Sequence, residues 1–354
     1  MEDRINRFRK ALPEGLDGAL ICSDVGRAYL TGLHSSAGTL LVLREAVYFI
    51  IDFRYIEKAR LTVKGCEVIL EDKLSEQLNK LLKQHQVSRL GIESSYLTVQ
   101  RYQAFQQKLS AEIAMGNEIS GILKKMRMFK SPEEVRKIKA AQKITDETFS
   151  HILNYIKPGM TEREIARELR DFADRQGSEG PSFDYIVVSG KNSSMPHGVP
   201  SEKPIASGDF VTMDFGCIID GYCSDMTRTI AVGSCTDEMR QVYETVLAAQ
   251  NAVFASIRPG VSCKEADAAA RNLIEKNYKG CFGHGTGHSV GLEIHEQPAC
   301  NTRDTTLLEP GMIMTVEPGI YLEGRFGVRI EDMVLVTETG CENLTGSPKE
   351  LFIL

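Results

Sequence analysis

Three of the seven histidines in this 354-residue chain lie within twelve residues, in the stretch GHGTGHSVGLEIHE at 283–296. His284 and His288 have the spacing of a helical zinc motif, but Gly285 stands where that motif carries its glutamate. The other glycines of the stretch also argue against a helix. We therefore expect an extended, glycine-kinked strand that lets backbone and ligand approach closely, with His197 in NSSMPHGVP as a further candidate.

Two aspartates lie in a second stretch, DFVTMDFGCIIDGYCSDMTRTIAV at 209–232. Its two apolar runs are joined by Asp220-Gly221, a strong signal for a two-residue hairpin loop. With that loop, Asp214 faces Thr227, and Asp225 is the diagonal neighbour of Asp214 on the same face. Diagonal neighbours are roughly 7 Å apart or less at Cβ, which is close enough for two carboxylates to share a cation.

A second pair of acids, Glu317 and Glu331, lies in GMIMTVEPGIYLEGRFGVRIEDMVLVTE, where two strand-like runs flank a Gly-rich connection. We expect Glu317 to end the first run and Glu331 to lie within the second. Arg329 would share the strand face of Glu331, where it could orient a carboxylate or contact a substrate; a simple cross-strand salt bridge is the alternative.

Four carboxylates directed towards one point would repel each other strongly, and divalent cations would remove that conflict. Oxygen ligands together with one imidazole favour Mn²⁺, Co²⁺, Fe²⁺ or Zn²⁺ over a thiolate-type zinc site. The nine cysteines are scattered and never form a C-x-x-C pair, so we expect reduced thiols.

The segments expected to position these acids are repeated within the chain. Thr161 to Glu164 reads as a capping box that opens a helix, and Ser262 to Glu265 repeats it 101 residues later. The strand-like run at 208–216 carries Asp214, and 311–319 echoes it 103 residues downstream with Glu317. We expect two αβ halves that face each other.

The first third of the chain has a different pattern. From Gly18 to about Ile92, apolar runs such as GALICS and AVYFIID alternate with helix-like segments, which is typical of an α/β domain. Ser131-Pro-Glu-Glu134 then supplies an N-cap, a proline and a capping glutamate for a new helix. Because the chain exceeds the usual size of one core, we predict an α/β protein with domains at 1–127 and 128–354.

The composition of the chain limits the classes of function that it can have. The formal net charge of −6 offers no basic field for nucleic acid or anionic lipid. The N-terminus is charged from its first residues, and no run of about 18 apolar residues occurs. We expect a cytoplasmic protein that has no signal peptide, no membrane span and no nucleic-acid partner.

The phrases VTMDFG, GYCSDMTRT, GHGTGHSVGLEIHE, TVEPGIY and GVRIED resemble, in order, those of the pita-bread metallopeptidases, the group that contains aminopeptidase P, prolidase and methionine aminopeptidase. They cover most of residues 131–354. YLTGLHSSAG and DFRYIEKAR are similar to the creatinase-like α/β domain that precedes the catalytic domain in aminopeptidase P and prolidase. Methionine aminopeptidases generally lack that domain. The resemblance implies an N-terminal creatinase-like domain followed by a pseudo-two-fold duplicated pita-bread catalytic domain.

The resemblance also implies a site for two divalent metal ions per subunit, with manganese expected and cobalt, zinc or iron as alternatives. Asp214 would chelate one ion, Asp225 and Glu331 would bridge both, and His288 and Glu317 would complete the other. A hydroxide between the ions would attack the scissile carbonyl, and Glu317 would shuttle a proton.

Other residues match positions around the substrate in this group. The resemblance implies that His197, His284 and His295 contact the substrate and support catalysis, with His284 near the scissile amide and His295 near the transition state and the proline pocket. Tyr321 and Arg329 match positions that support the ligands and face the substrate.

The implied function is hydrolysis of the bond between an N-terminal residue and proline, in Xaa-Pro dipeptides or longer Xaa-Pro peptides. The choice between dipeptidase and aminopeptidase depends on whether the pocket is closed beyond the proline. Arg303 is a possible holder of a free carboxylate, although a plain surface arginine is the favoured interpretation.

Two other functions stay open, a methionine aminopeptidase-like exopeptidase and a non-catalytic peptide-binding protein on the same fold. The second, like a metal-free enzyme of the creatine-hydrolase type, is disfavoured because all five expected ligands are present. The resemblance further implies a homodimer in which the partner's N-terminal domain closes the substrate site. His34 is a candidate for reaching across, with a structural loop histidine as the alternative.

Overall fold

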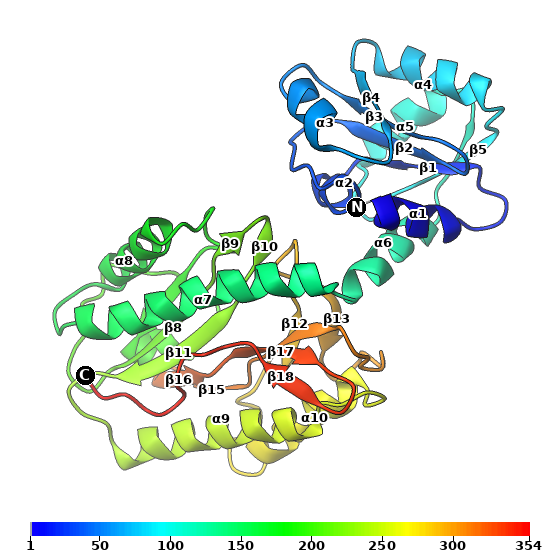
Figure 1. The fold of residues 1–354 in the computed structure, drawn as a ribbon. Helices are drawn as coiled ribbons and strands as arrows, with labels where there is room; N and C mark the ends of the chain where they lie inside the picture. The colour runs from blue at the N-terminus through cyan, green and yellow to red at the C-terminus, as the bar shows by residue number, and fades with distance from the viewer. Residues whose placement is uncertain (1) are drawn as a thin grey trace. The chain divides into compact units, whose positions relative to one another are not determined.

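A computed structural model describes residues 2–354, and Met1 lies outside the described residues. The chain forms two compact units that divide between Met126 and Arg127, and the sequence pattern places the boundary one residue later (Figure 1). Among the described residues, no helix combines the length and the apolar character that crossing a bilayer requires.

The first unit is built on a mixed six-stranded sheet. Its strand order is β4-β3-β2-β1-β5-β6, with β1–β2 and β2–β3 antiparallel and the other pairs parallel. Its strands are β1 (Gly18–Ile21), β2 (Thr39–Leu43), β3 (Val47–Ile51), β4 (Glu67–Leu70), β5 (Arg89–Ile92) and β6 (Glu112–Ala114). Its helices are α1 (Glu2–Lys10), α2 (Asp24–Thr31), α3 (Ile56–Thr62), α4 (Leu74–Gln84), α5 (Val99–Lys108) and α6 (Glu118–Met128), and α6 continues two residues past the division.

This sheet forms because β1, β2 and β3 are short runs whose residues are all buried and, apart from Thr39, largely apolar. Leu82 of α4 and Phe105 of α5 belong to the same hydrophobic core as Leu41 of β2. The alternating strand and helix pattern predicted for this part of the chain is confirmed.

The second unit contains two helical pairs around a set of short sheets. Its helices are α7 (Pro132–Tyr155), α8 (Glu162–Arg175), the 3-10 helix η1 (Gly190–Ser194), α9 (Asp237–Ser256) and α10 (Cys263–Ile274). Its strands are β7 (Ile186–Ser189), β8 (Phe210–Phe215), β9 (Ile218–Ile219), β10 (Tyr222–Cys223), β11 (Met226–Ala231), β12 (Gly287–Ser289), β13 (Glu296–Cys300), β14 (Ile313–Val316), β15 (Gly319–Leu322), β16 (Phe326–Arg329), β17 (Asp332–Val336) and β18 (Cys341–Asn343).

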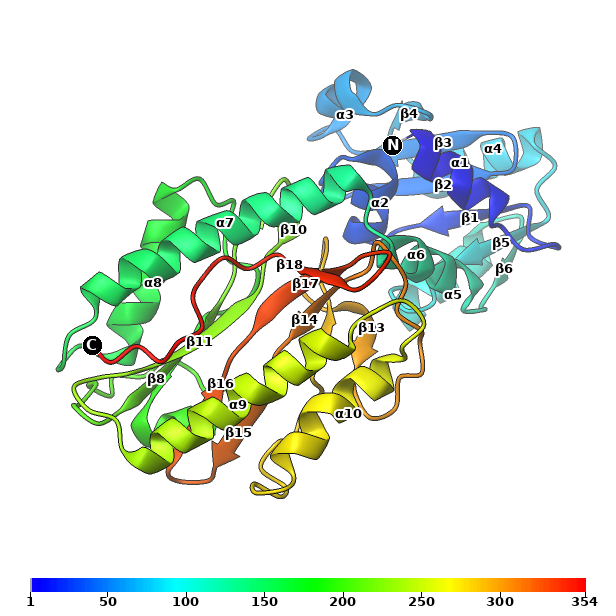
Figure 2. The same ribbon diagram turned by 60° about the horizontal axis from the view of Figure 1, so that its bottom comes forward.

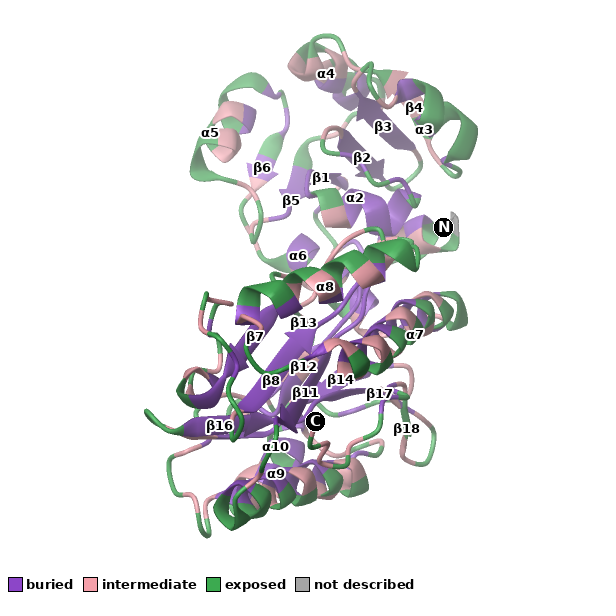
Figure 3. Ribbon diagram, turned by 90° about the vertical axis from the view of Figure 1, so that its left-hand side faces the viewer, coloured by how far each residue is buried: buried purple, intermediate pink, exposed green. Residues whose placement is uncertain are grey.

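The predicted internal repeat is visible in this unit. Capping boxes open α8 at Thr161 and α10 at Ser262, and a third, at Ser131, opens α7. The pair α7 and α8 lies on one side of the strands and the pair α9 and α10 on the other (Figures 1 and 2). Figure 3 shows that the strands between them are buried along almost their whole length, while α8 and α9 expose their outer faces. The two αβ halves therefore enclose a sheet core whose residues are mostly buried.

The first predicted hairpin forms with the expected register, because Asp214 of β8 pairs with Thr227 of β11. Its ladder is interrupted, however, after Phe215 and Met226, and it resumes as β9 and β10 with Ile218 opposite Cys223. Gly216 lies in the gap, where an added Cβ would come within 1.9 Å of the Ser224 carbonyl oxygen. Only glycine fits there, and the gap leaves Asp225 outside the ladder.

The second hairpin corrects the expected position of Glu331. Val316 pairs with Asp332, and Gly319 pairs with Arg329, so the register is the same on both sides of a second gap. Glu317 and Glu331 lie opposite each other inside that gap: Glu317 follows β14, and Glu331 sits between β16 and β17, where the sequence pattern predicted one unbroken strand.

The second ladder is weakened at Pro318, which has no N–H to donate and accepts from the Ile330 N–H at only 3.5 Å. The Glu317 N–H donates to the Thr286 carbonyl at 2.8 Å, and the Glu331 N–H donates to the Thr227 carbonyl at 3.0 Å. Buried amide groups must be paired, and these two point out of the ladder towards neighbouring elements. The second contact also ties the second hairpin to β11 of the first.

Candidate functional site

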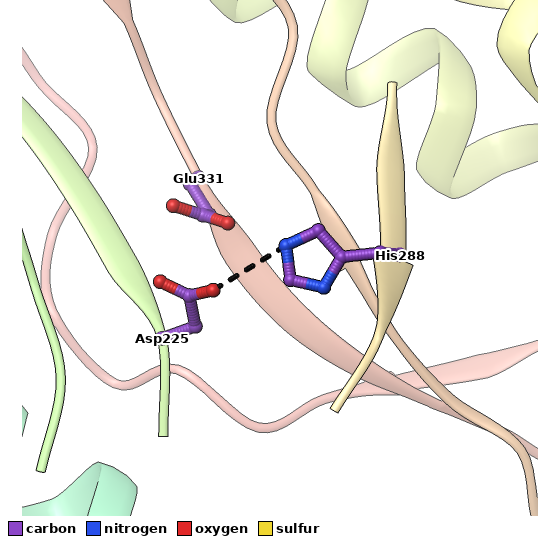
Figure 4. Close-up of side chains that lie close together, drawn as sticks. All are labelled: Asp225, His288 and Glu331. Carbon is purple, nitrogen blue, oxygen red and sulfur yellow. Dashed lines mark ion pairs between the residues drawn. The ribbon is translucent and has the colours of Figure 1, made fainter. Parts of the chain in front are cut away.

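The interrupted hairpins and β12 direct their polar side chains towards one point. Ligand atoms of Asp225, His288 and Glu331 all lie within 4.8 Å of one another (Figure 4). His288 Nε2 is 3.6 Å from Asp225 Oδ2 and 3.5 Å from Glu317 Oε1. Three of the five predicted ligands are thus in mutual reach and Glu317 is in reach of His288, although the four come from positions up to 106 residues apart in the chain.

His288 is held in the orientation that a ligand needs. An added Cβ at Gly287 would lie 2.0 Å from the Thr315 carbonyl oxygen, so a glycine is required for β12 to approach β14 this closely. His288 Nδ1 faces the Ser289 carbonyl oxygen at 3.2 Å and must be the donor there. Nε2 therefore keeps its lone pair, which points towards the acids, and burial lowers the pKa of His288 and favours this neutral form.

Asp214, the fifth predicted ligand, is bound on one side by Arg329. Its Oδ2 accepts a hydrogen bond from Arg329 Nη2 at 2.5 Å, whereas its Oδ1 is buried without a partner. Arg329 Nε donates to Thr227 Oγ1 at 3.0 Å, and Thr227 Oγ1 donates to Glu331 Oε2 at 2.7 Å. Arg329 and Thr227 therefore link the acid of the first hairpin to an acid of the second.

The carboxylates repel each other in a buried environment. Burial raises the pKa of Asp225 well above its usual range, and the nearby Asp214 and Glu317 raise it further. Burial likewise raises the pKa of Glu331, with Asp225 as the next cause, and burial raises the pKa of Glu317. One buried arginine cannot neutralise four carboxylates, so the cluster lacks positive charge.

The donor set fits divalent metal ions. It offers carboxylate oxygens and one neutral imidazole, which suits Mn²⁺, Co²⁺, Fe²⁺ or Zn²⁺. The unpartnered buried Oδ1 of Asp214 is an acceptor that a cation would satisfy, and buried polar atoms are rarely left unpaired.

A cavity of about 680 Å³ opens onto this cluster. It is lined by all five predicted ligands, by the three predicted substrate-side histidines and by Arg329. Further lining residues are Phe183, Asp184, Ile186, Pro196, Arg271, Gly283, Gly285, Gly287, Ile294, Ala299, Asn301, Thr302 and Arg303. The volume exceeds what a small dipeptide fills, so the cavity of this unit has room for residues beyond a proline.

The predicted histidines occupy different parts of the cavity wall. His284 Nδ1 donates to the Gly285 carbonyl oxygen at 2.8 Å. The other ring nitrogen of the neutral imidazole, Nε2, therefore accepts from the Tyr321 hydroxyl at 2.8 Å. His295 packs edge-on against His288, with ring centroids 4.5 Å apart. Burial and the neighbouring His288 lower the pKa of His295, and burial raises the pKa of Tyr321 to about 12. His197 is exposed on a loop at the cavity.

A buried carboxylate fixes the base of the His197 loop. Glu162, in the first turn of α8, is fully buried and accepts from the Ser189 N–H at 2.7 Å and the Ser201 N–H at 3.1 Å. The side chains of Ser189, Asn192 and Ser201 also donate to it. Further along, the Pro196 carbonyl accepts from Arg329 Nη1 at 3.1 Å. The loop is therefore anchored at both ends and beside His197.

Sequence reasoning missed several supporting residues. Thr315 donates to Glu317 at 3.3 Å and accepts from the His288 N–H, and its position two residues before Glu317 on one strand could have revealed it. Asp267 and Arg271 of α10 hold the backbone of the histidine stretch, with Arg271 donating to the His284 carbonyl at 2.7 Å. No local pattern distinguishes that pair from an ordinary helical ion pair.

Comparison with known proteins agrees with this geometry. The sequence pattern of Metallopeptidase family M24 matches residues 136–338, and that of the Creatinase/Prolidase N-terminal domain matches residues 4–129. An Xaa-Pro dipeptidase of Pyrococcus furiosus is 36% identical over 99% of this chain and 100% of its own length.

Solved structures are equally similar. The Xaa-Pro dipeptidase of Bacillus anthracis superimposes with a TM-score of 0.96 at 44% identity, covering 99% of both chains. An X-Pro aminopeptidase of Thermotoga maritima superimposes with a TM-score of 0.90 at 34% identity, covering 98% of this chain and 100% of that one. These matches confirm the resemblance and the predicted fold class.

Proposed function

Because the chain belongs to metallopeptidase family M24, we propose that it is an exopeptidase that hydrolyses the bond between an N-terminal residue and proline. The observation that carries the proposal is the convergence of Asp225, His288 and Glu331 at a cavity that three more histidines line. The substrate class is supported by full-length similarity to proteins named Xaa-Pro dipeptidase and X-Pro aminopeptidase.

We assign two metal ions to this one buried set of ligands, with manganese as the expected metal. Asp225 and Glu331 would be shared between the ions, Asp214 would complete one site, and His288 and Glu317 the other. When bound, the ions supply Lewis-acid chemistry, which polarises a peptide carbonyl and makes a water molecule nucleophilic at neutral pH.

The residues of the chain supply orientation and proton transfer. Glu317 lies at the cavity, so it would accept the proton of the attacking water and pass it to the departing proline nitrogen. His295 and His197 would contact the substrate carbonyl and the proline side. His284 accepts from Tyr321, and Arg329 holds Tyr321 in turn at 2.9 Å, so these two residues fix an imidazole beside the substrate.

An activity on peptides longer than dipeptides is a second candidate. The open cavity of about 680 Å³ favours it, whereas closure by another domain would favour the dipeptidase. We propose a homodimer in which residues 1–127 contribute to closing the partner's substrate site, with the exposed His34 as a contact. Phe53, which is 82% exposed in the first unit, offers apolar surface for such an interface.

We also propose a cytoplasmic location. All nine cysteines are unpaired, and four of them are only partly buried. Thiols persist in reducing compartments, so this pattern suits the cytoplasm.

The function is tested with metal-stripped protein resupplied with Mn²⁺, Co²⁺ or Zn²⁺ and offered Ala-Pro, Ala-Pro-Ala and Met-Ala-Ser. Cleavage of Ala-Pro alone identifies a dipeptidase, and cleavage of Ala-Pro-Ala identifies an aminopeptidase. Turnover of Met-Ala-Ser in preference to both would replace proline specificity with a methionine-directed activity.

Two variants control the assay. Asp225→Asn removes a predicted shared metal ligand. The turnover of this variant should fall by more than the roughly 10- to 100-fold that replacing a residue hydrogen-bonded to a metal ligand costs. Asp220→Asn changes the exposed hairpin turn and should leave turnover unchanged. No turnover by the wild-type protein with any metal would refute the catalytic proposal and favour a peptide-binding protein.

A further inference from the structure

One buried side chain closes the gap in the second hairpin without contacting the cavity. Gln250 of α9 is fully buried, and its Nε2 donates to the Val316 carbonyl at 3.1 Å and to the Ile330 carbonyl at 3.2 Å. Val316 directly precedes Glu317, and Ile330 directly precedes Glu331. A single amide group therefore spans the two strands at the point where each delivers a carboxylate to the cluster.

The gap explains why such a donor is needed. Pro318 has no N–H to donate to the facing Ile330 carbonyl, and the Ile330 N–H reaches the Pro318 carbonyl only at 3.5 Å, so the ladder is weak there. A buried carbonyl group left without a donor is destabilising. The Gln250 amide donates to the Ile330 carbonyl in place of the missing Pro318 N–H, and its second proton reaches the Val316 carbonyl.

This arrangement carries a cost that packing alone does not explain. The Gln250 Oε1 is buried and has no hydrogen-bond partner among residues 2–354, a cost that an apolar side chain of similar volume would avoid. The contacts that the amide does make are both to carbonyls next to predicted metal ligands. The structure therefore retains the Gln250 amide, although only its nitrogen is hydrogen-bonded, at the position where this amide fixes the separation of Glu317 and Glu331.

The first hairpin closes its own gap differently. Ser182 Oγ lies 2.9 Å from both the Cys217 and the Ser224 carbonyl oxygens, on the two sides of that gap, so the two carbonyls share its one proton. Side chains thus bridge the strands at both interrupted ladders, and in the first the Ser224 hydroxyl also contacts Cys217 across the gap. The recurrence in both halves indicates that the bridges belong to the architecture that opens the ladders and still holds their strands in register.

We propose that Gln250 is a positioning residue that sets the spacing of Glu317 and Glu331 for metal binding. This inference rests on the proposed function, because it assumes that the two glutamates hold metal ions. Gln250 itself does not line the substrate cavity, and among the described residues its hydrogen bonds go to backbone carbonyls and not to a ligand side chain. Its removal would let the two strands separate or rotate, and the carboxylates would lose their preorganised geometry.

The test compares Gln250→Met with a matched control, Gln142→Met. Gln142 lies on α7, is equally buried and also has an unpartnered Oε1, but its Nε2 donates to Asp146 at 3.0 Å. Calorimetric titration of metal-free protein with Mn²⁺ gives the dissociation constants. Thermal unfolding of the same metal-free samples reports stability separately.

We expect Gln250→Met to weaken Mn²⁺ binding roughly 10- to 100-fold, and Gln142→Met to keep wild-type affinity even if its metal-free Tm falls. Excess Mn²⁺ should partly restore kcat of the Gln250 variant while KM stays near the wild-type value. Should Gln250→Met fail to fold, Gln250→Asn decides, because its shorter amide cannot reach both carbonyls.

The outcomes separate two failures. Unchanged Mn²⁺ affinity in folded Gln250 variants, with only a lower Tm, would overturn the positioning role and leave a structural one. Absence of Mn²⁺ binding by the wild-type protein would instead refute the proposed metal site itself.

Discussion

Arg329 and Asp214 form a buried ion pair behind the carboxylate cluster, with Nη2 and Oδ2 2.5 Å apart. The same guanidinium donates to Thr227, Tyr321 and the Pro196 carbonyl, so one side chain orients both hairpins and the His197 loop. A lysine carries the charge but cannot reproduce this fork of donors.

Arg329→Lys should therefore reduce kcat/KM by roughly 10- to 100-fold, because the ligand and the loop lose their fixed orientation. Steady-state kinetics on Ala-Pro at saturating Mn²⁺ measure the effect. Arg325→Lys, at an exposed pair with Glu238, is the control and should behave as wild type. Equal activity of both variants would show that the buried fork is dispensable.

Metal removal should destabilise the second unit. Four carboxylates face each other at the cluster, and a cation that binds only the folded state stabilises it by about 2.7 kcal/mol at a hundred times its dissociation constant. Differential scanning calorimetry with and without a chelator should show a lower Tm for the metal-free protein. An identical Tm at any Mn²⁺ concentration would contradict a metal-holding cluster.

Glu162→Gln should loosen the His197 loop. The amide can no longer accept from all the donors that converge on the carboxylate, and a buried group left without its partner costs about 1–3 kcal/mol. We expect a lower Tm together with a higher KM, since His197 lies at the cavity. Glu202→Gln, at an exposed pair with Arg163, is the matched control. A change in Tm alone would mean that the loop position does not affect the substrate.

The acid sensitivity of the protein should depend on Glu296. Burial raises the pKa of Glu296, but Lys130 and Arg127 outweigh burial and hold it below its usual value. A folded-state pKa below the unfolded one stabilises the protein above the unfolded pKa of about 4.3, and this stability is lost as the pH falls through the folded value. The pKa of Lys130 is lowered by burial, yet this amine is protonated in both states at acid pH and adds no slope there.

Urea unfolding of metal-free protein between pH 6 and pH 3 checks this prediction. The wild-type free energy of unfolding should fall with acid more steeply than that of Glu296→Gln, which has no carboxyl group to titrate at this position. The variant itself should be less stable near pH 6, because buried Lys130 loses its carboxylate partner and Arg127 loses one of two. Parallel profiles would mean that Glu296 does not contribute to the acid transition.

Much of the architecture follows from neighbouring residues. The three capping boxes need only a hydroxyl residue and a glutamate three positions later, and Asp220-Gly221 alone placed Asp214 opposite Thr227. The ligand types were also readable, because carboxylates within apolar strands are rarely buried unless they are paired or bind a metal ion.

The long-range contacts around both interruptions could not be read in this way, although Pro318 does signal a missing ladder donor. Glu331 reads as part of one continuous strand, yet its N–H bonds to Thr227, more than 100 residues earlier in the chain. Gln250 carries no local signal at all, since its partners belong to two distant strands. The reason is physical: capping and turn formation depend on contacts within a few residues, whereas the placing of one hairpin against the other depends on contacts between elements more than 100 residues apart. The sequence by itself determined which residues hold charge and how their strands pair, and the tertiary structure decided where those strands separate so that the charges meet.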